Sequence, residues 1–197
     1  RKRPYKKVKT MKRPPRGESI EKRPAEVDAR ETFGHWEGDT VYSKKDGSKA
    51  LFVLTERLTR EEIIMRIKDR TAESVIKALD RIERKYGPVL FRKIFQTITF
   101  DNGGEFADVD RMERSPLRKT LKRTKVYFCH PYSSYERGSN ECQNKMIRRP
   151  FPKGTDFGNV TDAEVARAEQ WMNNYPRKIL GWKTSEMLFR ECVAALI

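Results

Sequence analysis

Apolar and β-branched runs in the first half of the chain predict three consecutive strands. Each run has the length of an ordinary strand, and they cover residues 34–43, 49–57 and 61–68. The segment between the first two contains Asp46-Gly47, a pair typical of a hairpin turn. Leu58-Thr59-Arg60 separates the second run from the third.

The next segment changes to the period of a helix. Residues 71–86 carry an apolar stripe at helical spacing, formed by Val75, Ile76, Leu79 and Ile82. Thr71 is suited to cap the start of this helix, and Gly87-Pro88 is suited to end it. We therefore predict an amphipathic helix packed against the sheet.

The second half mixes strands and helices. The pattern predicts strands over 94–100 and 125–129, with a basic stretch over 111–125 that Pro116 interrupts. Helices are expected from about 138–140 until Pro150, over 161–174 after Thr161, and over 184–195 after Thr184 or Ser185. This order predicts an α/β fold with a mixed sheet, although periodicity does not fix the strand order.

Charge narrows the class of partner. The chain has 197 residues, with 43 lysines and arginines against 28 acids, which gives a net charge of +15. So strong a basic excess favours a polyanion, and nucleic acid first, over a protein that is merely soluble. Mean hydropathy is −0.84, and no apolar run reaches the roughly 18 residues that a membrane span needs. No signal peptide is visible in the sequence.

The basic residues gather at the start of the chain. Residues 1–16 hold nine lysines and arginines and no acid. We interpret this segment as an extended arm that contacts DNA phosphates, and a plain solvated linker is the alternative. The predicted contacts are Arg1, Lys2, Arg3, Lys6, Lys7, Lys12 and Arg13. Residues 17–33 are read as an irregular polar lead-in, so that residues 1–33 form arm and linker and residues 34–197 form one domain.

The spacing of the cysteines and histidines argues against a disulfide framework, a zinc finger and a serine or cysteine hydrolase. The three cysteines have no CxxC spacing, which favours a reducing compartment over a disulfide framework. Cys129-His130 followed by Cys142 lacks the spacing of a zinc finger. Apart from Cys129, which directly precedes His130, neither His35 nor His130 has a nucleophile beside it, so a serine or cysteine hydrolase has little support.

Two aspartates stand where strands would carry them. Asp39 lies inside an apolar strand, where a carboxylate is costly to bury unless it is paired or binds a metal. The alternative is that Asp39 faces solvent on an edge strand. Asp101 ends a strand and runs into Asn102-Gly103-Gly104, where glycine lets the backbone approach a ligand. The alternative for Asp101 is an ordinary turn.

Glu141 is the candidate third acid. On a helix it shares a face with Asn144, Lys145 and Arg148, which offers a metal ligand, an amide and two cations to a phosphodiester. A solvated helix face with a Glu–Lys pair is the alternative. Glu136 is the competing acid, in the loop before the helix. Carboxylates on two strands and one helix suit a pair of hard divalent cations, which phosphodiester transfer needs.

Several longer strings resemble a known superfamily. They read RPAEVDARETFGHWEGDTV, TITFDNGGEFA, HPYSSYERGSNECQNKMIRR, FPKGTDF and NNYPRKILGWKT. In this order they resemble the DDE transposases and retroviral integrases, and more closely the bacterial insertion-sequence transposases of the IS-thirty family. The resemblance implies an RNase H-like fold with a five-stranded mixed sheet flanked by helices. It also implies Asp39, Asp101 and Glu141 as catalytic metal ligands, choosing Glu141 over Glu136.

Two departures from the family pattern concern the catalytic helix. The 39 residues between Asp101 and Glu141 are a few more than usual, and the excess falls in the basic stretch. Pro150 stands where the family usually has an aromatic residue, and we expect it to shorten the helix by a turn.

The resemblance implies a catalytic core that cuts DNA strands and joins them to target DNA with two Mg²⁺ or Mn²⁺ ions. Asn144, Lys145, Arg148 and the arm would bind DNA. Expected partners are transposon ends, target DNA and a second copy of the chain at least, in the bacterial cytoplasm at the nucleoid and not at a membrane. A DNA-recognising helix-turn-helix region is expected upstream of Arg1. The alternatives are a nuclease of the same fold without joining activity, and a silent DNA-binding regulator.

Overall fold

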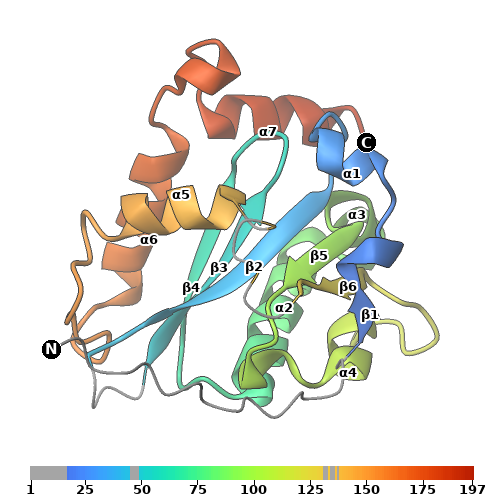
Figure 1. The fold of residues 1–197 in the computed structure, drawn as a ribbon, viewed down its shortest axis with the longest axis horizontal. Coiled ribbons are helices and arrows are strands. Elements are labelled where there is room, and N and C mark those ends of the chain that lie inside the picture. Colours follow the sequence, from blue (N-terminus) through green and yellow to red (C-terminus); the bar gives the residue numbers. More distant parts are fainter. Residues whose placement is uncertain (1–16, 45–48, 131–132, 134–135, 137) are drawn as a thin grey trace, which may run out of the picture.

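One six-stranded sheet runs through the computed structural model, which describes residues 17–44, 49–130, 133, 136 and 138–197 (Figure 1). The strand order is β1-β6-β5-β2-β3-β4. The strands are β1 (Glu18–Ser19), β2 (His35–Tyr42), β3 (Ala50–Glu56), β4 (Glu62–Ile67), β5 (Thr97–Phe100) and β6 (Lys125–Phe128). β2, β3 and β4 are antiparallel, whereas β5 pairs in parallel with β2 and β6. The predicted mixed sheet is confirmed.

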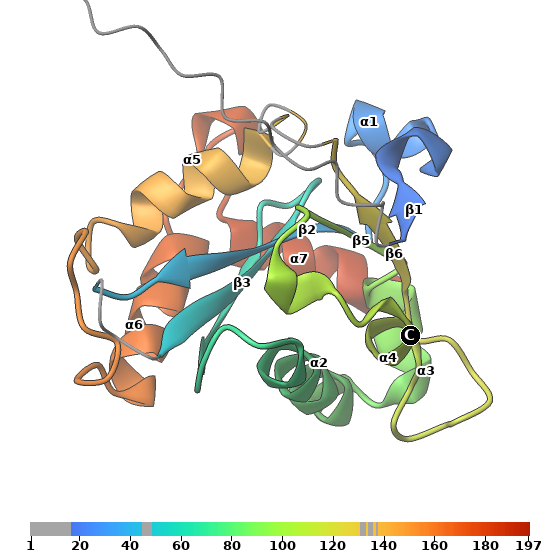
Figure 2. The ribbon, with the colours of Figure 1, turned by 60° about the horizontal axis from the view of Figure 1, so that its bottom comes forward.

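Helices cover both faces of the sheet (Figure 2). The longer ones are α2 (Ala72–Tyr86), α3 (Pro88–Ile94), α5 (Gly138–Ile147), α6 (Asp162–Asn173) and α7 (Ser185–Ala194). The short ones are η1 (Ile20–Lys22), α1 (Glu26–Ala29), η2 (Gly104–Phe106), α4 (Val109–Glu113) and η4 (Lys178–Leu180). Three layers result, with the sheet in the middle.

Alternating side chains of β3 divide the apolar core in two. Ala50, Phe52 and Leu54 pack with residues of α2 and α3 on one face. Leu51 and Val53 pack with residues of α5 and α6 on the other face. This period-two pattern is what a strand buried on both sides produces, and it holds α5 over the strand that carries Asp39.

The predicted helix starts are confirmed. The Thr71 side chain accepts a hydrogen bond from the backbone N–H of Ser74 at the start of α2. Thr161 forms a reciprocal capping box with Glu164 at the start of α6. Both threonines satisfy N–H groups that the first helical turn leaves without a partner.

Two local predictions were wrong. The strand expected from residue 94 begins only at Thr97, because Pro88 opens α3 and Ile94 still belongs to that helix. Residues 17–33 are not irregular throughout, since β1, η1 and α1 lie there and β1 adds a sixth strand beside β6. Within the basic stretch, Arg123 is fully buried against Asp80 and Glu83.

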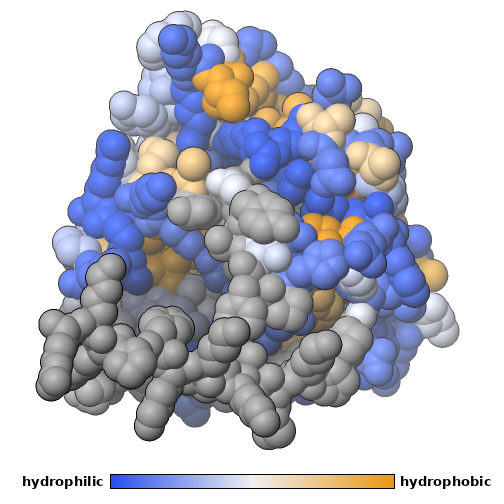
Figure 3. All heavy atoms as spheres, in the orientation of Figure 1, coloured by the Kyte–Doolittle hydropathy of each residue, from blue (hydrophilic) through white to orange (hydrophobic). Residues whose placement is uncertain are grey.

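In the part of the chain described, no helix combines the length and apolar character that crossing a membrane requires. Hydrophilic residues predominate over the described surface on the face that Figure 3 shows.

Candidate active site

Asp39 and Asp101 lie on neighbouring parallel strands. β2 is flanked by β5 and β3, so the edge-strand alternative for Asp39 is wrong. β2 and β5 pair Glu37 with Thr99. Asp39 and Asp101 each follow this last pair by two residues. Burial raises the pKa of Tyr42, and Asp101 and Asp39 are both among the charges that raise it further, so the two aspartates lie at the same end of the sheet.

Backbone contacts fix the loop that carries Asp101. Its Oδ1 accepts a hydrogen bond of 2.8 Å from the backbone N–H of Gly103. The Asn102 side chain donates to the carbonyl oxygen of Cys129 at 2.7 Å, which ties the loop to the end of β6. A Cβ at Gly103 would lie 2.9 Å from Asp101 Oδ1, so a side chain there would crowd the carboxylate. Asp101 therefore lies in an ordered turn, and its predicted role as a metal ligand stays a prediction.

α5 reaches the same place through Asn144. Its Nδ2 donates a hydrogen bond of 2.7 Å to Asp39 Oδ2, while Asp39 Oδ1 accepts from the backbone N–H of Thr40 at 2.9 Å. Glu141 lies on α5 three residues before Asn144, a spacing that places both positions on one helical face. The side chain of Glu141 lies outside the described part of the structure.

The other predicted residues have varied surroundings. Lys145 is exposed on α5. Arg148 is partly buried, and its guanidinium donates to the carbonyl oxygen of Tyr42 at 3.2 Å, while burial lowers its pKa. The competing acid Glu136 accepts hydrogen bonds from the backbone N–H of His130 at 2.9 Å and pairs with the His130 ring at 2.8 Å. The predicted arm contacts lie outside the described residues.

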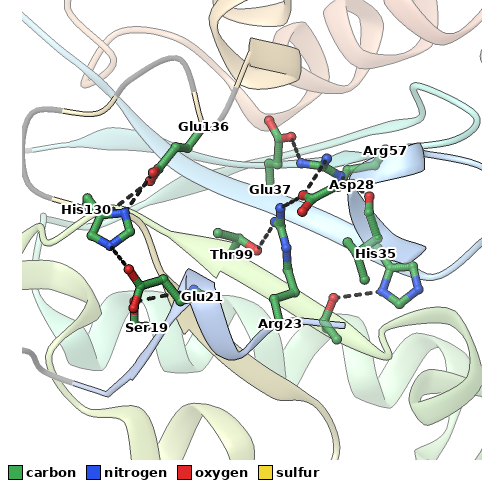
Figure 4. Close-up of polar contacts among 12 residues, drawn as sticks. Ser19, Glu21, Arg23, Asp28, His35, Glu37, Arg57, Thr99, His130 and Glu136 are labelled. Atoms are coloured by element: carbon green, nitrogen blue, oxygen red, sulfur yellow. Dashed lines mark hydrogen bonds and ion pairs between the residues drawn. The ribbon is translucent and has the colours of Figure 1, made fainter. Parts of the chain in front are cut away.

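The described contacts of the two histidines are with residues other than Asp39 and Asp101. The Glu136 contact raises the pKa of His130, and Glu21 lies at the other ring nitrogen (Figure 4). His35 lies on β2 with its ring beside Thr97, and burial lowers its pKa.

A buried ion network supports the two strands just before the aspartates (Figure 4). Glu37 is fully buried and accepts a hydrogen bond of 2.5 Å from Arg57. Arg23 donates to Thr99 Oγ1 at 2.9 Å and also contacts Asp28. Since Glu37 precedes Asp39 by two residues on its strand, and Thr99 precedes Asp101 likewise, the network holds the sheet face that leads to the site.

Four nearby residues escaped the sequence analysis. Glu105 is buried, accepts a hydrogen bond of 2.6 Å from Thr40 Oγ1, and pairs with Arg70 at 3.0 Å. Arg70 also contacts Tyr42. Burial alone would raise the pKa of Glu105, but the hydrogen bonds from Thr40, the backbone and Arg70 lower it on balance. Glu105 stands in the string that carries Asp101, and Thr40 stands in the string that carries Asp39. No sequence signal marked Arg70 or Tyr42.

The donor set fits a hard divalent cation. Asp39 and Asp101 supply carboxylate oxygens, which Mg²⁺ and Mn²⁺ prefer. Asn144 Oδ1 is buried and has no hydrogen-bond partner among the described residues, so a further oxygen lies beside Asp39. No group of three acidic, histidine or cysteine side chains able to hold a metal is found among the described residues, and the Glu141 side chain is not one of these.

Two solved viral structures share this fold. The catalytic core domain of BIV integrase is 18% identical, with a TM-score of 0.58 over 81% of this chain and 95% of that one. A chain of the simian T-cell lymphotropic virus intasome in complex with PP2A regulatory subunit B56 gamma is 19% identical, with a TM-score of 0.60 over 79% of this chain and 53% of that one. The fold is therefore that of an integrase catalytic core, which is RNase H-like as predicted.

Sequence comparison gives the family. A family model described as Integrase core domain matches residues 29–134. The chain is 36% identical over 88% of its length to the transposase for insertion sequence element IS4351 of Bacteroides fragilis. It is 35% identical over 90% of its length to transposase InsI for insertion sequence element IS30C of Escherichia coli strain K12. It covers 50% and 43% of these relatives.

The chain belongs to the integrase core domain family, and the resemblance to insertion-sequence transposases is confirmed.

Proposed function

We propose that this chain is the catalytic core of a DDE transposase, which cuts DNA strands and joins them to target DNA. The observation that carries the proposal most directly is the hydrogen bond from Asn144 to Asp39. It joins α5, the helix of Glu141, to the strand that carries Asp39, and so supports a site that combines Glu141 with the two aspartates. The similarity to insertion-sequence transposases supports the same function.

In this proposal Asp39, Asp101 and Glu141 hold two Mg²⁺ or Mn²⁺ ions. When bound, the ions supply the Lewis acidity that activates an attacking hydroxyl and stabilises the leaving 3′-oxygen. Asn144 keeps the Asp39 carboxylate oriented through its Nδ2 hydrogen bond. The buried Glu37–Arg57 pair keeps β2 in place while the DNA strands bind.

DNA is the proposed substrate, both as transposon ends and as target. Lys145 and Arg148 would hold its backbone beside the site, and the arm would add affinity that does not depend on sequence. We propose that the protein works in bacterial cells at the nucleoid, as an oligomer of at least two copies. The division into a basic arm and linker over residues 1–33 and a core over residues 34–197 remains a proposal, and β1 within residues 17–33 pairs with the core sheet.

A joining assay separates the proposal from its two alternatives. The full-length protein is incubated with a labelled element end, a target plasmid and Mg²⁺, with Asp101→Asn as the inactive control. A transposase yields both nicked and joined products. Nicks without joined product would identify a nuclease of the same fold, and binding without nicks would identify a silent regulator.

A further inference from the structure

An arginine and a tyrosine meet beside the aspartates, although they are distant in sequence. Tyr42 ends β2, and Arg70 lies between β4 and α2. The antiparallel register brings them together, because Tyr42 pairs with Ala50 on β3 and Ala50 pairs with Ile67 on β4. Tyr42 follows Asp39 by three residues, so the pair lies at the same end of the sheet as the candidate active site.

The guanidinium of Arg70 is held in one orientation. Its Cζ lies 3.8 Å from the centroid of the Tyr42 ring. Its Nη2 donates to the Tyr42 hydroxyl at 2.7 Å and to Glu105 Oε1 at 3.0 Å. A planar group fixed by stacking and by two hydrogen bonds loses little further freedom when it binds an anion.

Glu105 connects this orientation to the aspartates. Thr40 donates to Glu105 through Oγ1 and to Asp39 through its backbone N–H. On the other side, a Cβ at Gly103 would lie 2.7 Å from Glu105 Oε2 and 2.9 Å from Asp101 Oδ1. Glu105 therefore lies close to the Asp101 carboxylate and contacts the residue that follows Asp39, and it holds Arg70 at this end of the sheet.

Much of the pair remains open to solvent. The Arg70 side chain is 37% exposed and Tyr42 is 53% exposed. Both contacts of the guanidinium with described residues use Nη2, whereas a guanidinium has five N–H donors. The group can therefore keep Glu105 and also donate to a phosphate.

We propose that Arg70 and Tyr42 form a binding site for the DNA backbone at the edge of the active site. Arg70 donates to a phosphate oxygen, the Tyr42 ring holds the guanidinium plane, and Glu105 acts as the positioning residue. Carboxylates alone would repel a phosphodiester, and a fixed cation at their edge offsets that repulsion. The inference rests on the proposed function, because it takes DNA as the substrate.

The salt dependence of DNA binding tests this site. Binding of duplex DNA by the full-length protein is measured across a salt series without divalent cations, for wild type and Arg70→Gln. Glutamine removes the charge and keeps an amide donor, and a wild-type unfolding curve for the variant checks that the fold is retained. We expect about 10-fold weaker binding, as for a lost charged hydrogen bond, and a log–log salt slope shallower by about 0.9. Arg70→Lys should restore the slope.

Lys77→Ala is the matched control, because Lys77 is 71% exposed on α2 and pairs with Glu73. Its slope should equal that of wild type. A wild-type slope for both Arg70→Gln and Arg70→Ala would overturn the inference and leave a purely structural role. A cleavage assay with Mg²⁺ distinguishes failure of this site from failure of the proposed function. If the wild-type protein cleaves DNA but Arg70→Gln does not change the salt slope, only the Arg70 site is refuted. If the wild-type protein does not cleave DNA but its salt slope depends on Arg70, only the proposed transposase activity is refuted.

Discussion

At the scale of the residue, the orientation of Asp39 depends on one amide. The Asn144 side chain donates a hydrogen bond to Asp39 Oδ2, and the backbone N–H of Thr40 donates one to Asp39 Oδ1. Asn144→Ala removes the side-chain donor and leaves the carboxylate in place. Because a lost partner beyond the ligands commonly reduces metal-site function 10- to 100-fold, we expect cleavage to fall by about that factor at saturating DNA. Single-turnover cleavage measures this rate.

Asn174→Ala provides the control for that prediction. Asn174 is exposed after α6 and donates to the carbonyl oxygen of Gln170. It should cleave at the wild-type rate. Equal rates for Asn144→Ala and wild type would show that the Asp39 contact does not matter for catalysis.

The sequence singled out Asp39 and Asp101 as candidates because each stands in a short string with its own local pattern. It did not identify Arg70, since its partners Tyr42 and Glu105 lie 28 and 35 residues away in the chain. Such contacts arise from strand pairing, which periodicity does not determine. For Asp39, Asp101, Glu141 and the DNA-binding residues, the predicted roles stay predictions.

At the scale of the element, β2 and β5 approach closely at Gly38. A Cβ there would lie 2.1 Å from Cε1 of Phe100, whose ring also stacks on Phe106 at 4.3 Å. Gly38→Ala should therefore destabilise the fold by about 1 to 3 kcal/mol, the usual range for overpacking. Gly104→Ala is the control, because no atom lies within 4 Å of its Cβ position. Urea unfolding that gives both variants equal stability would contradict this close contact.

The junction of β4 and α6 contains buried acids. Burial, with Glu169 and Glu186 nearby, raises the pKa of Glu61 to about 8. Burial also raises the pKa of Glu62 well above its ordinary value, and that of Glu169 as well. The cations facing this cluster are Lys85 and Arg177.

A folded-state pKa above the unfolded value means that the folded protein binds more protons. The protonated acids therefore contribute fully to stability below about pH 4.5, the ordinary pKa of glutamate. This contribution is lost as the pH rises toward 8, the raised pKa of Glu61. Glu62→Gln should raise the free energy of unfolding at pH 8 by about 1 to 3 kcal/mol and change it little at pH 4.5. The exposed Glu191→Gln is the control, and a Glu62→Gln gain that is equal at both pH values would contradict the buried charge.

Elements with complete local signals were predicted well. α2 and α6 have an apolar stripe and a threonine cap within their own sequence. α3 was missed because Gly87-Pro88 ends one helix and opens the next. β1 was missed because a strand of two residues has no period, and it forms only by pairing with β6.

At the scale of the whole molecule, the net charge of +15 should make DNA binding depend strongly on salt. Deleting residues 1–16 removes nine positive charges and no acid. We expect weaker non-specific binding and a shallower log–log salt slope, measured by fluorescence anisotropy with duplex DNA. An unchanged slope would mean that the segment is only a linker.

The central claim is that three carboxylates from two strands and one helix form one metal-dependent site. The most direct measurement is Mg²⁺-dependent cleavage and joining of a labelled element end by Asp39→Asn, Asp101→Asn and Glu141→Gln. Each variant keeps the side-chain volume and loses an anionic ligand. We expect each to lose at least about 100-fold in rate, with a wild-type unfolding curve, while Glu136→Gln stays active. Normal cleavage by Glu141→Gln together with inactive Glu136→Gln would contradict the proposed site.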